Sequence, residues 1–313
     1  MTVTAAAAPP VPAWLRAAAA EPLALEDAAF AAAAALTTLD ALVRRQEPWA
    51  GAWRQRLALT AAAATAQRAG RAEDASALRD ALLLTRPGDD VGPAGRMLLA
   101  WRALVSRPVA ALRSEPVLSD VAADFGCALD EEASGRIGDD IEQVAGAIGN
   151  AATGALEAIA VLERHDGRIA RELGPWLADA VLAGRLGWPR AVPLLGAQPG
   201  LAGGGRSSPT RGQPQPAARQ AVLAAYARAA LQAVDLAAEL SRRAERLVAA
   251  APKLRAKGAG AAIEKLLADD AVAAAQEVPG MSDRGLRRLF DRLVALGAVR
   301  ELTGRTTFRI YGL

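Results

Sequence analysis

Residues 281–313 read MSDRGLRRLFDRLVALGAVRELTGRTTFRIYGL, and this stretch decides the fold of the C-terminal part of the chain. Ser282 suits the N-cap of a helix, because its hydroxyl can accept a hydrogen bond from a first-turn amide. Gly297 suits the left-handed residue that ends a helix. Between them, large apolar residues recur at steps of three and four, which predicts one buried face: Leu286, Leu289, Phe290, Leu293, Val294 and Leu296.

Two short strands are predicted after this helix. Residues 299–303 and 307–311 alternate in polarity, and Gly304 between them suits a tight hairpin turn. Upstream, residues 261–268 and 272–276 have the composition of two short helices. Three helices followed by a hairpin predict a winged-helix domain over residues 258–313, with the hairpin as its wing.

The basic charge of the chain is concentrated in the last helix and hairpin of this domain. Residues 281–313 hold seven arginines against three acids, a net charge of +4, whereas the whole chain carries +3 and the rest therefore −1. In a winged helix bound to duplex DNA, helix 283–296 enters the major groove and the wing lies on the backbone or minor groove. The candidate DNA-binding residues are Ser282, Arg284, Arg287, Arg288, Arg292, Arg300, Arg305 and Arg309. The same arginines also suit a solvated face that docks another protein.

The composition predicts a mainly α-helical protein. Hydrophobic residues make up 52% of the 313 residues, but alanine dominates them and aromatic residues reach only 4%. Cys127 and His165 are the only cysteine and histidine, so neither a disulfide nor a structural zinc site is expected. The absence of a basic, apolar leader and of a strongly apolar run of about 20 residues predicts a cytoplasmic protein without membrane contact.

Composition shifts along the chain suggest five regions. Alanine and proline at the start predict a disordered tail, and acidic residues are concentrated in residues 119–150. Glycine and proline indicate a flexible linker over residues 197–217. The regions are a tail (1–12), an N-terminal helical region (13–118), an acidic insert or interrupted helix (119–150), a helical core that contains the linker (151–257), and the winged helix (258–313).

Other conspicuous residues suit structural roles. The six tryptophans are expected to fill the core of an alanine-rich helical body rather than stack on bases. Asp89 and Asp90 are expected to form a turn and cap a helix. The glycines within residues 200–205 do not form a phosphate loop, since no Lys-Ser or Lys-Thr follows them. The basic residues between Arg242 and Lys257 suit either a wider DNA footprint or a wet helix face.

The second half of the chain resembles the Fic superfamily, whose members often end in a winged helix. Residues 296–305 match the wing, residues 186–190 match the layout after the catalytic motif, and residues 163–171 (ERHDGRIAR) match the motif itself. In that motif a histidine acts as general base, and a glycine loop before a helix binds nucleotide phosphates. The carried-over site would be His165, Asp166, Arg168 and Arg171.

The departures from the Fic motif imply a degenerate core. No Pro-Phe pair follows His165, which directly precedes Asp166, and two of the three Gly-Asn-Gly residues are missing. The shortened loop removes amide donors and displaces the histidine, and a misplacement of about 1 Å can cost roughly 100-fold in rate. The resemblance therefore implies a non-enzymatic protein without cofactors, and His165 suits a helix boundary better than a catalytic role.

Across its whole length the chain is similar to a bacterial family labelled domain of unknown function 1403. Residues 49–59 (WAGAWRQRLAL), 82–90 (LLLTRPGDD) and 308–313 (FRIYGL) carry this resemblance, which implies biology linked to plasmids and other mobile elements. We therefore expect a DNA-binding protein with a regulatory or plasmid-maintenance role, which binds duplex DNA as a monomer or as a homodimer. The alternatives are a kleisin-like adaptor of a chromosome-organising complex and a residual Fic-type nucleotide transferase.

Overall fold

A computed structural model describes residues 10–21, 24–86, 88–198, 216–254, 256, 258–305 and 307–313. Most of the expected N-terminal tail (residues 1–9) and of the expected linker (residues 199–215) lies outside this part of the chain. The prediction of a mainly α-helical protein is confirmed, since the described residues form twelve α-helices and only three short strands.

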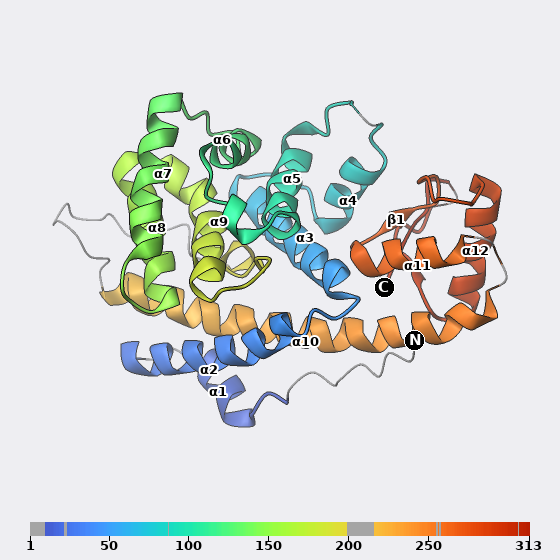
Figure 1. The fold of residues 1–313 in the computed structure, drawn as a ribbon, viewed down its shortest axis with the longest axis horizontal. Helices are drawn as coiled ribbons and strands as arrows, with labels where there is room; N and C mark the ends of the chain where they lie inside the picture. The colour runs from blue at the N-terminus through green and yellow to red at the C-terminus, as the bar shows by residue number, and fades with distance from the viewer. Residues whose placement is uncertain are drawn as a thin grey trace.

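Figure 1 shows the elements in chain order, coloured from blue at the N-terminus to red at the C-terminus. The helices are α1 (Ala13–Ala20), α2 (Leu25–Arg44), α3 (Ala50–Arg68), α4 (Ala75–Leu83), α5 (Gly92–Ser106), α6 (Glu115–Asp124), α7 (Glu131–Gly146), α8 (Ala151–His165), α9 (Gly167–Arg185), α10 (Pro216–Ala250), α11 (Ala259–Ala268) and α12 (Asp283–Ala295). The strands are β1 (Val272–Ala273), β2 (Arg300–Glu301) and β3 (Ile310–Gly312), and three 3₁₀ turns are η1 (Val109–Ala111), η2 (Leu195–Ala197) and η3 (Ala251–Lys253).

Helix α10 is the longest element and runs along the molecule from the α8 and α9 side to the C-terminal elements (Figure 1). It packs lengthwise on α2, because both helices present stripes of alanine and leucine that allow close approach. Among the described residues, the helical stretch Pro216–Lys253 alone is long and apolar enough to cross a membrane, although none was expected. More than half of its most apolar window is buried inside the protein, as in a core helix.

The acidic segment 119–150 is folded as helices rather than as an exposed insert. It comprises the end of α6 and all of α7, where Asp130 caps the helix by accepting a hydrogen bond from the Ala133 amide at 2.7 Å. Ile137 and Ile141 on α7 are fully buried against the neighbouring helices. The acidic residues occupy the solvent side of an amphipathic helix, which explains why composition alone suggested an insert.

The expectation that the tryptophans fill the core is confirmed for five of the six. Trp49, Trp53, Trp101, Trp176 and Trp188 are buried, whereas Trp14 on α1 is 50% exposed and lies beside Phe30 of α2. Several indole N–H groups donate to acceptors in other elements, as Trp176 does to the Ala100 carbonyl at 2.9 Å. Large aromatic side chains thus fill the gaps that small alanines leave between the helices.

A buried carboxyl group fixes the segment that follows α9. Asp179 of α9 is fully buried and accepts hydrogen bonds from the amides of Leu194 at 2.7 Å and Leu195 at 3.1 Å, at the start of η2. Burial disfavours the charged form more than these amides favour it, so the pKa of Asp179 rises from 3.8 to about 8. The side chain of Tyr226 on α10 lies beside it, and burial together with Asp179 raises the pKa of its hydroxyl.

We expect Asp179→Asn to make the protein less sensitive to pH. A carboxyl with a raised folded-state pKa contributes most to stability below its unfolded-state value of 3.8, and this contribution is lost as the pH rises towards about 8. Asparagine can keep the amide contacts without ionising in the unfolded state. The difference in unfolding temperature between variant and wild type is therefore expected to grow in favour of the variant from pH 5 to pH 8. A constant difference across that range would contradict the argument.

The C-terminal elements form a small helix–sheet unit, here called the C-terminal module (residues 258–313). Its antiparallel sheet has the order β1-β3-β2, with Val272 opposite Tyr311 and Arg300 opposite Gly312. The prediction of a helix over residues 272–276 is wrong, since these residues form β1 and a turn. The β-branched Val272 is fully buried beside β3, and that pairing outweighs the weak helical preference of the short alanine-rich segment.

The C-terminal module packs closely on the rest of the protein. Gly51 in the first turn of α3 faces the end of α11, where a Cβ atom would lie 2.5 Å from the Ala268 carbonyl oxygen. Only glycine permits this approach of two backbones. One continuous cluster of buried apolar side chains extends from Leu15 to Leu313 and includes α11 and α12. The core therefore does not divide at residue 258.

Candidate functional site

Helix α12 has the geometry that its sequence predicts. The Ser282 hydroxyl caps it by accepting a hydrogen bond from the Gly285 amide at 3.2 Å, and Gly297 ends it with a φ of 63°. On the predicted apolar face the buried residues are Leu286, Leu289, Phe290 and Leu293, and Phe290 stacks on Tyr311 with ring centroids 4.3 Å apart. Val294 was also predicted on this face but is 40% exposed. The helix lies at the outer edge of the molecule, on the side of the C-terminal module away from α8 and α9 (Figure 1).

The arginines of α12 form an exposed basic face, here called the arginine face (Arg284, Arg287, Arg288 and Arg292). None of these four side chains has a hydrogen bond or ion pair with the described part of the chain, and the same holds for the exposed Arg300 on β2. An arginine without an acid keeps its full charge and all its donors for a ligand. The face therefore suits a polyanion or an acidic protein surface.

The two arginines of the hairpin are engaged with the protein itself. Arg305 forms an ion pair with Asp80 of α4 at 2.6 Å, so the hairpin reaches across to the N-terminal helices. Arg309 lies 3.7 Å from Asp291 of α12 and donates to the Arg305 carbonyl at 3.2 Å. Of the candidate residues, Arg284, Arg287, Arg288 and Arg292 thus share one face, whereas Arg305 and Arg309 are tied to carboxylates beside it.

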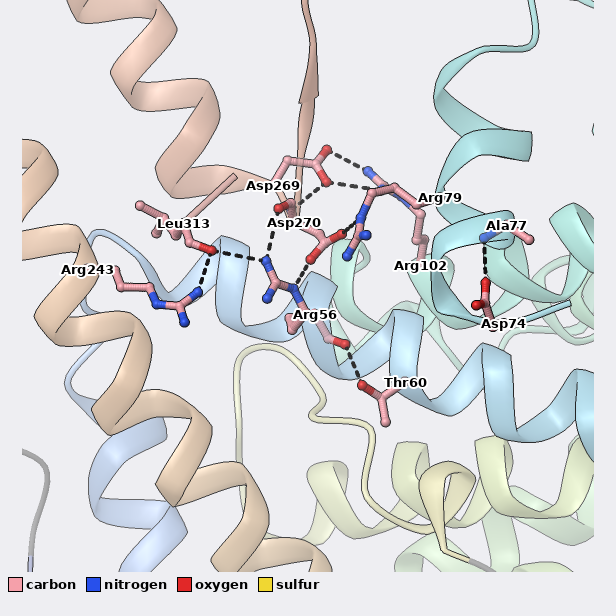
Figure 2. A network of polar contacts seen from close by, with 10 residues as sticks. All are labelled: Arg56, Thr60, Asp74, Ala77, Arg79, Arg102, Arg243, Asp269, Asp270 and Leu313. Atoms are coloured by element: carbon pink, nitrogen blue, oxygen red, sulfur yellow. Dashed lines mark hydrogen bonds and ion pairs between the residues drawn. The ribbon is translucent and has the colours of Figure 1, made fainter. Parts of the chain in front are cut away.

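A buried ion-pair network holds the C-terminal module in place (Figure 2). Asp270, between α11 and β1, is 4% exposed and accepts hydrogen bonds from Arg56 of α3 and from Arg79 of α4, the latter at 2.6 Å. Burial by itself would raise the pKa of this carboxyl, but the two guanidinium groups outweigh it and hold the pKa below its ordinary value. The charge is therefore compensated inside the interface.

Two further contacts extend the network. Arg102 of α5 binds both carboxylate oxygens of Asp269, at 3.0 and 2.6 Å, which is the bidentate geometry of a strong ion pair. Arg243 of α10 donates to the main-chain oxygen of Leu313 at 2.9 Å (Figure 2). Side chains from four helices, α3, α4, α5 and α10, thus anchor the module. The sequence signal for this interface is the pair of consecutive aspartates directly after α11, but no local pattern pairs them with arginines so far away in the chain.

The Fic-like residues lie at the junction of α8 and α9, far along the chain from α12. Asp166 alone connects the two helices, and its carboxylate accepts a hydrogen bond from the Arg168 amide at 2.7 Å. The helix N-terminus where a nucleotide phosphate would bind is thus occupied by the protein's own carboxylate. His165 lies 3.5 Å from Asp140 of α7 in a helix-end contact, and Arg168 and Arg171 are exposed.

No metal-binding cluster occurs among the described residues, since no three histidine, cysteine, aspartate or glutamate side chains converge there. Cys127 is buried, and burial raises the pKa of its thiol, which disfavours the reactive thiolate. Asp90 accepts a hydrogen bond from the amide of Gly92, the first residue of α5, at 3.0 Å, whereas the N-cap position itself is Val91.

These features define a mainly helical protein whose C-terminal module packs against the other helices and carries an exposed, arginine-rich helix. The chain belongs to the family described as "Protein of unknown function (DUF1403)", whose family model matches residues 1–313. Comparisons with curated proteins and with solved structures found no match.

Proposed function

We propose that this protein binds duplex DNA without catalysing a reaction, through a winged helix formed by its C-terminal module. The observation that carries this proposal is the arginine face of α12. Four exposed guanidinium groups, which have no acidic partner among the described residues, lie on one capped helix at the edge of the molecule. Arginine is the residue best suited to phosphate oxygens and guanine edges, because its planar fork donates two parallel hydrogen bonds.

The layout of the module supports the same proposal. An amphipathic helix precedes two antiparallel strands, and a strand from upstream of that helix pairs with the last of them in the order β1-β3-β2. A winged helix places its recognition helix directly before the hairpin in this way. In this proposal α12 enters the major groove, Arg300 lies beside it, and the hairpin approaches the backbone.

The charge distribution also favours a polyanionic partner. The +4 stretch of residues 281–313 is attached to a remainder with a net charge of −1, so a duplex would approach the arginine face in preference to other surfaces. Regulatory or plasmid-maintenance roles in the cytoplasm fit such a protein.

We expect intact protein to bind duplex DNA with a strong dependence on salt. Four or five arginine–phosphate contacts would give a slope of about −3 to −5 for the logarithm of the binding constant against the logarithm of salt concentration. The measurement is fluorescence anisotropy with a random duplex and with duplexes from the neighbourhood of the gene, between low and physiological salt. Tighter binding to one of the native duplexes would indicate sequence recognition.

Absence of binding at low salt would refute the proposal. The arginine face would then be a protein-docking surface, and co-purification of a chromosome-organising ATPase or a second winged-helix protein would favour the adaptor alternative. Saturable ATP binding that is lost on Arg168→Ala would instead favour the nucleotide-transferase alternative.

A further inference from the structure

The hairpin of the C-terminal module exposes an aromatic side chain. Phe308 is 69% exposed, whereas the other two aromatic residues of the module, Phe290 and Tyr311, are buried and stacked on each other. The core of the module therefore contains Phe290 and Tyr311 but not Phe308. A single exposed apolar side chain is common on protein surfaces, so it is the backbone and the surroundings of Phe308 that indicate a contact with a partner.

The backbone of Phe308 adopts a conformation that is unfavourable for a bulky residue and that turns its side chain outward. Strict alternation along residues 307–311 predicts that Phe308 and Ile310 point to the same side and that both are buried. Phe308 instead has a φ of 54°, so β3 begins only at Ile310 and Phe308 turns outward while Ile310 stays buried. The left-handed conformation is unfavourable for a bulky residue, and glycine would adopt it freely.

The surroundings of Phe308 are basic and adjoin α12. Arg305 and Arg309 flank it in the hairpin, and Arg309 reaches to within 3.7 Å of Asp291 on α12. The exposed ring therefore lies at the edge of the module where the hairpin meets the helix that carries the arginine face. An apolar side chain beside the arginine face suits duplex DNA, whose phosphates attract the cations of α12 while its stacked bases accept an apolar wedge.

We propose that Phe308 inserts between base pairs of duplex DNA, next to the groove occupied by α12. This inference rests on the proposed DNA-binding function and adds a contact that is apolar rather than electrostatic. Pyrimidine–purine steps unstack most easily, so a TA or CA step at the edge of the footprint is the expected insertion point. Arg305 and Arg309, which pair with Asp80 and Asp291, would keep the hairpin in place, and the arginine face would contact the phosphates beside that step.

The test compares wild-type protein with Phe308→Ala on duplexes that carry 2-aminopurine at successive positions. Insertion unstacks the reporter base, so wild type is expected to increase its fluorescence at one step, and Phe308→Ala to abolish this increase. Binding measured by anisotropy is expected to weaken about tenfold, the range found for loss of one aromatic stacking contact. The salt slope is expected to stay unchanged, because the variant removes no phosphate contact.

Two further variants separate this role from general effects. Phe30→Ala is the matched control, because Phe30 is 66% exposed and lies on α2, and it is expected to bind DNA like wild type. Phe308→Gly removes the side chain and also relieves the left-handed backbone. It is expected to unfold at a temperature equal to or above that of wild type while binding DNA as weakly as Phe308→Ala.

The outcomes distinguish this inference from the function on which it rests. If wild type binds DNA in a salt-dependent manner but Phe308→Ala retains its affinity and reporter signal, the insertion is refuted and DNA binding stands. If wild type does not bind DNA at low salt, both are refuted. An equal loss of affinity in Phe30→Ala and Phe308→Ala would also overturn the insertion, since it would reflect a general effect of apolar surface.

Discussion

Replacing Asp270 with alanine is expected to destabilise the protein by about 3–5 kcal/mol, the largest stability effect that the structure suggests. The substitution would leave the guanidinium groups of Arg56 and Arg79 without their anion, and their side chains are only 17% and 13% exposed. Removing one partner of a buried ion pair costs more than the pair itself contributes, because the remaining charge is desolvated without compensation. Chemical denaturation followed by circular dichroism measures this difference.

Asp269→Ala provides the matched control, because the two aspartates are adjacent and both bind arginines of the N-terminal helices. Asp269 and Arg102 are 29% and 24% exposed, so water screens their pair and can solvate the remaining guanidinium. The expected loss is about 1 kcal/mol. Equal destabilisation by the two substitutions would show that burial does not set the strength of this junction.

The pH dependence of stability provides a second comparison between wild type and Asp270→Ala. Since the folded-state pKa of Asp270 lies below its ordinary value, its contribution is present at neutral pH and is lost as the pH falls through that lowered pKa. Wild type is therefore expected to lose more stability than Asp270→Ala when acidified below about pH 4. This direction is opposite to that of Asp179, whose contribution is lost as the pH rises.

The double substitution Arg287→Ala with Arg288→Ala is expected to abolish specific DNA binding and leave the fold intact. Both side chains are exposed on α12 and contact no acid in the described part of the chain, so the folded protein loses little. Each arginine that binds a base is worth about 1–3 kcal/mol of discrimination, and the pair therefore about 2–6 kcal/mol. Anisotropy titrations at several salt concentrations measure both the affinity and the slope, and circular dichroism verifies the fold.

Arg168→Ala with Arg171→Ala removes the same charge from α9 and serves as the control. These arginines are also exposed, but they lie at the junction of α8 and α9 rather than on the arginine face. The control is expected to bind DNA with the affinity and salt slope of wild type. Comparable losses in the two double variants would mean that net charge alone drives binding, and the assignment of α12 to the groove would fail.

The features that could be predicted from the sequence are those that depend on neighbouring residues. The α12 helix follows from a Ser cap, apolar residues at steps of three and four, and a terminal glycine, all within 16 residues of each other. The prediction at residues 272–276 is wrong because the strand there exists only through its pairing with β3, almost 40 residues later. Short segments take their conformation from such partners rather than from their composition.

The junction between the module and the helical body could not be predicted for the same reason. Asp270 is separated from Arg56 by 214 positions and from Arg79 by 191, and no local pattern pairs them. Phe308 was likewise placed in a regular strand, because alternation gives no sign of a left-handed residue within it. DNA binding and the winged-helix assignment remain predictions that the experiments above address.

The burial of Cys127 has a practical consequence for these experiments. It is the single cysteine of the chain, and its thiol is both shielded from solvent and held in the neutral form at physiological pH. A maleimide dye would therefore react with an introduced cysteine in preference to the native one. Replacing an exposed residue such as Thr307 or Ala295 would then provide a fluorescent reporter next to Phe308 or at the end of α12, without first removing a cysteine from the core.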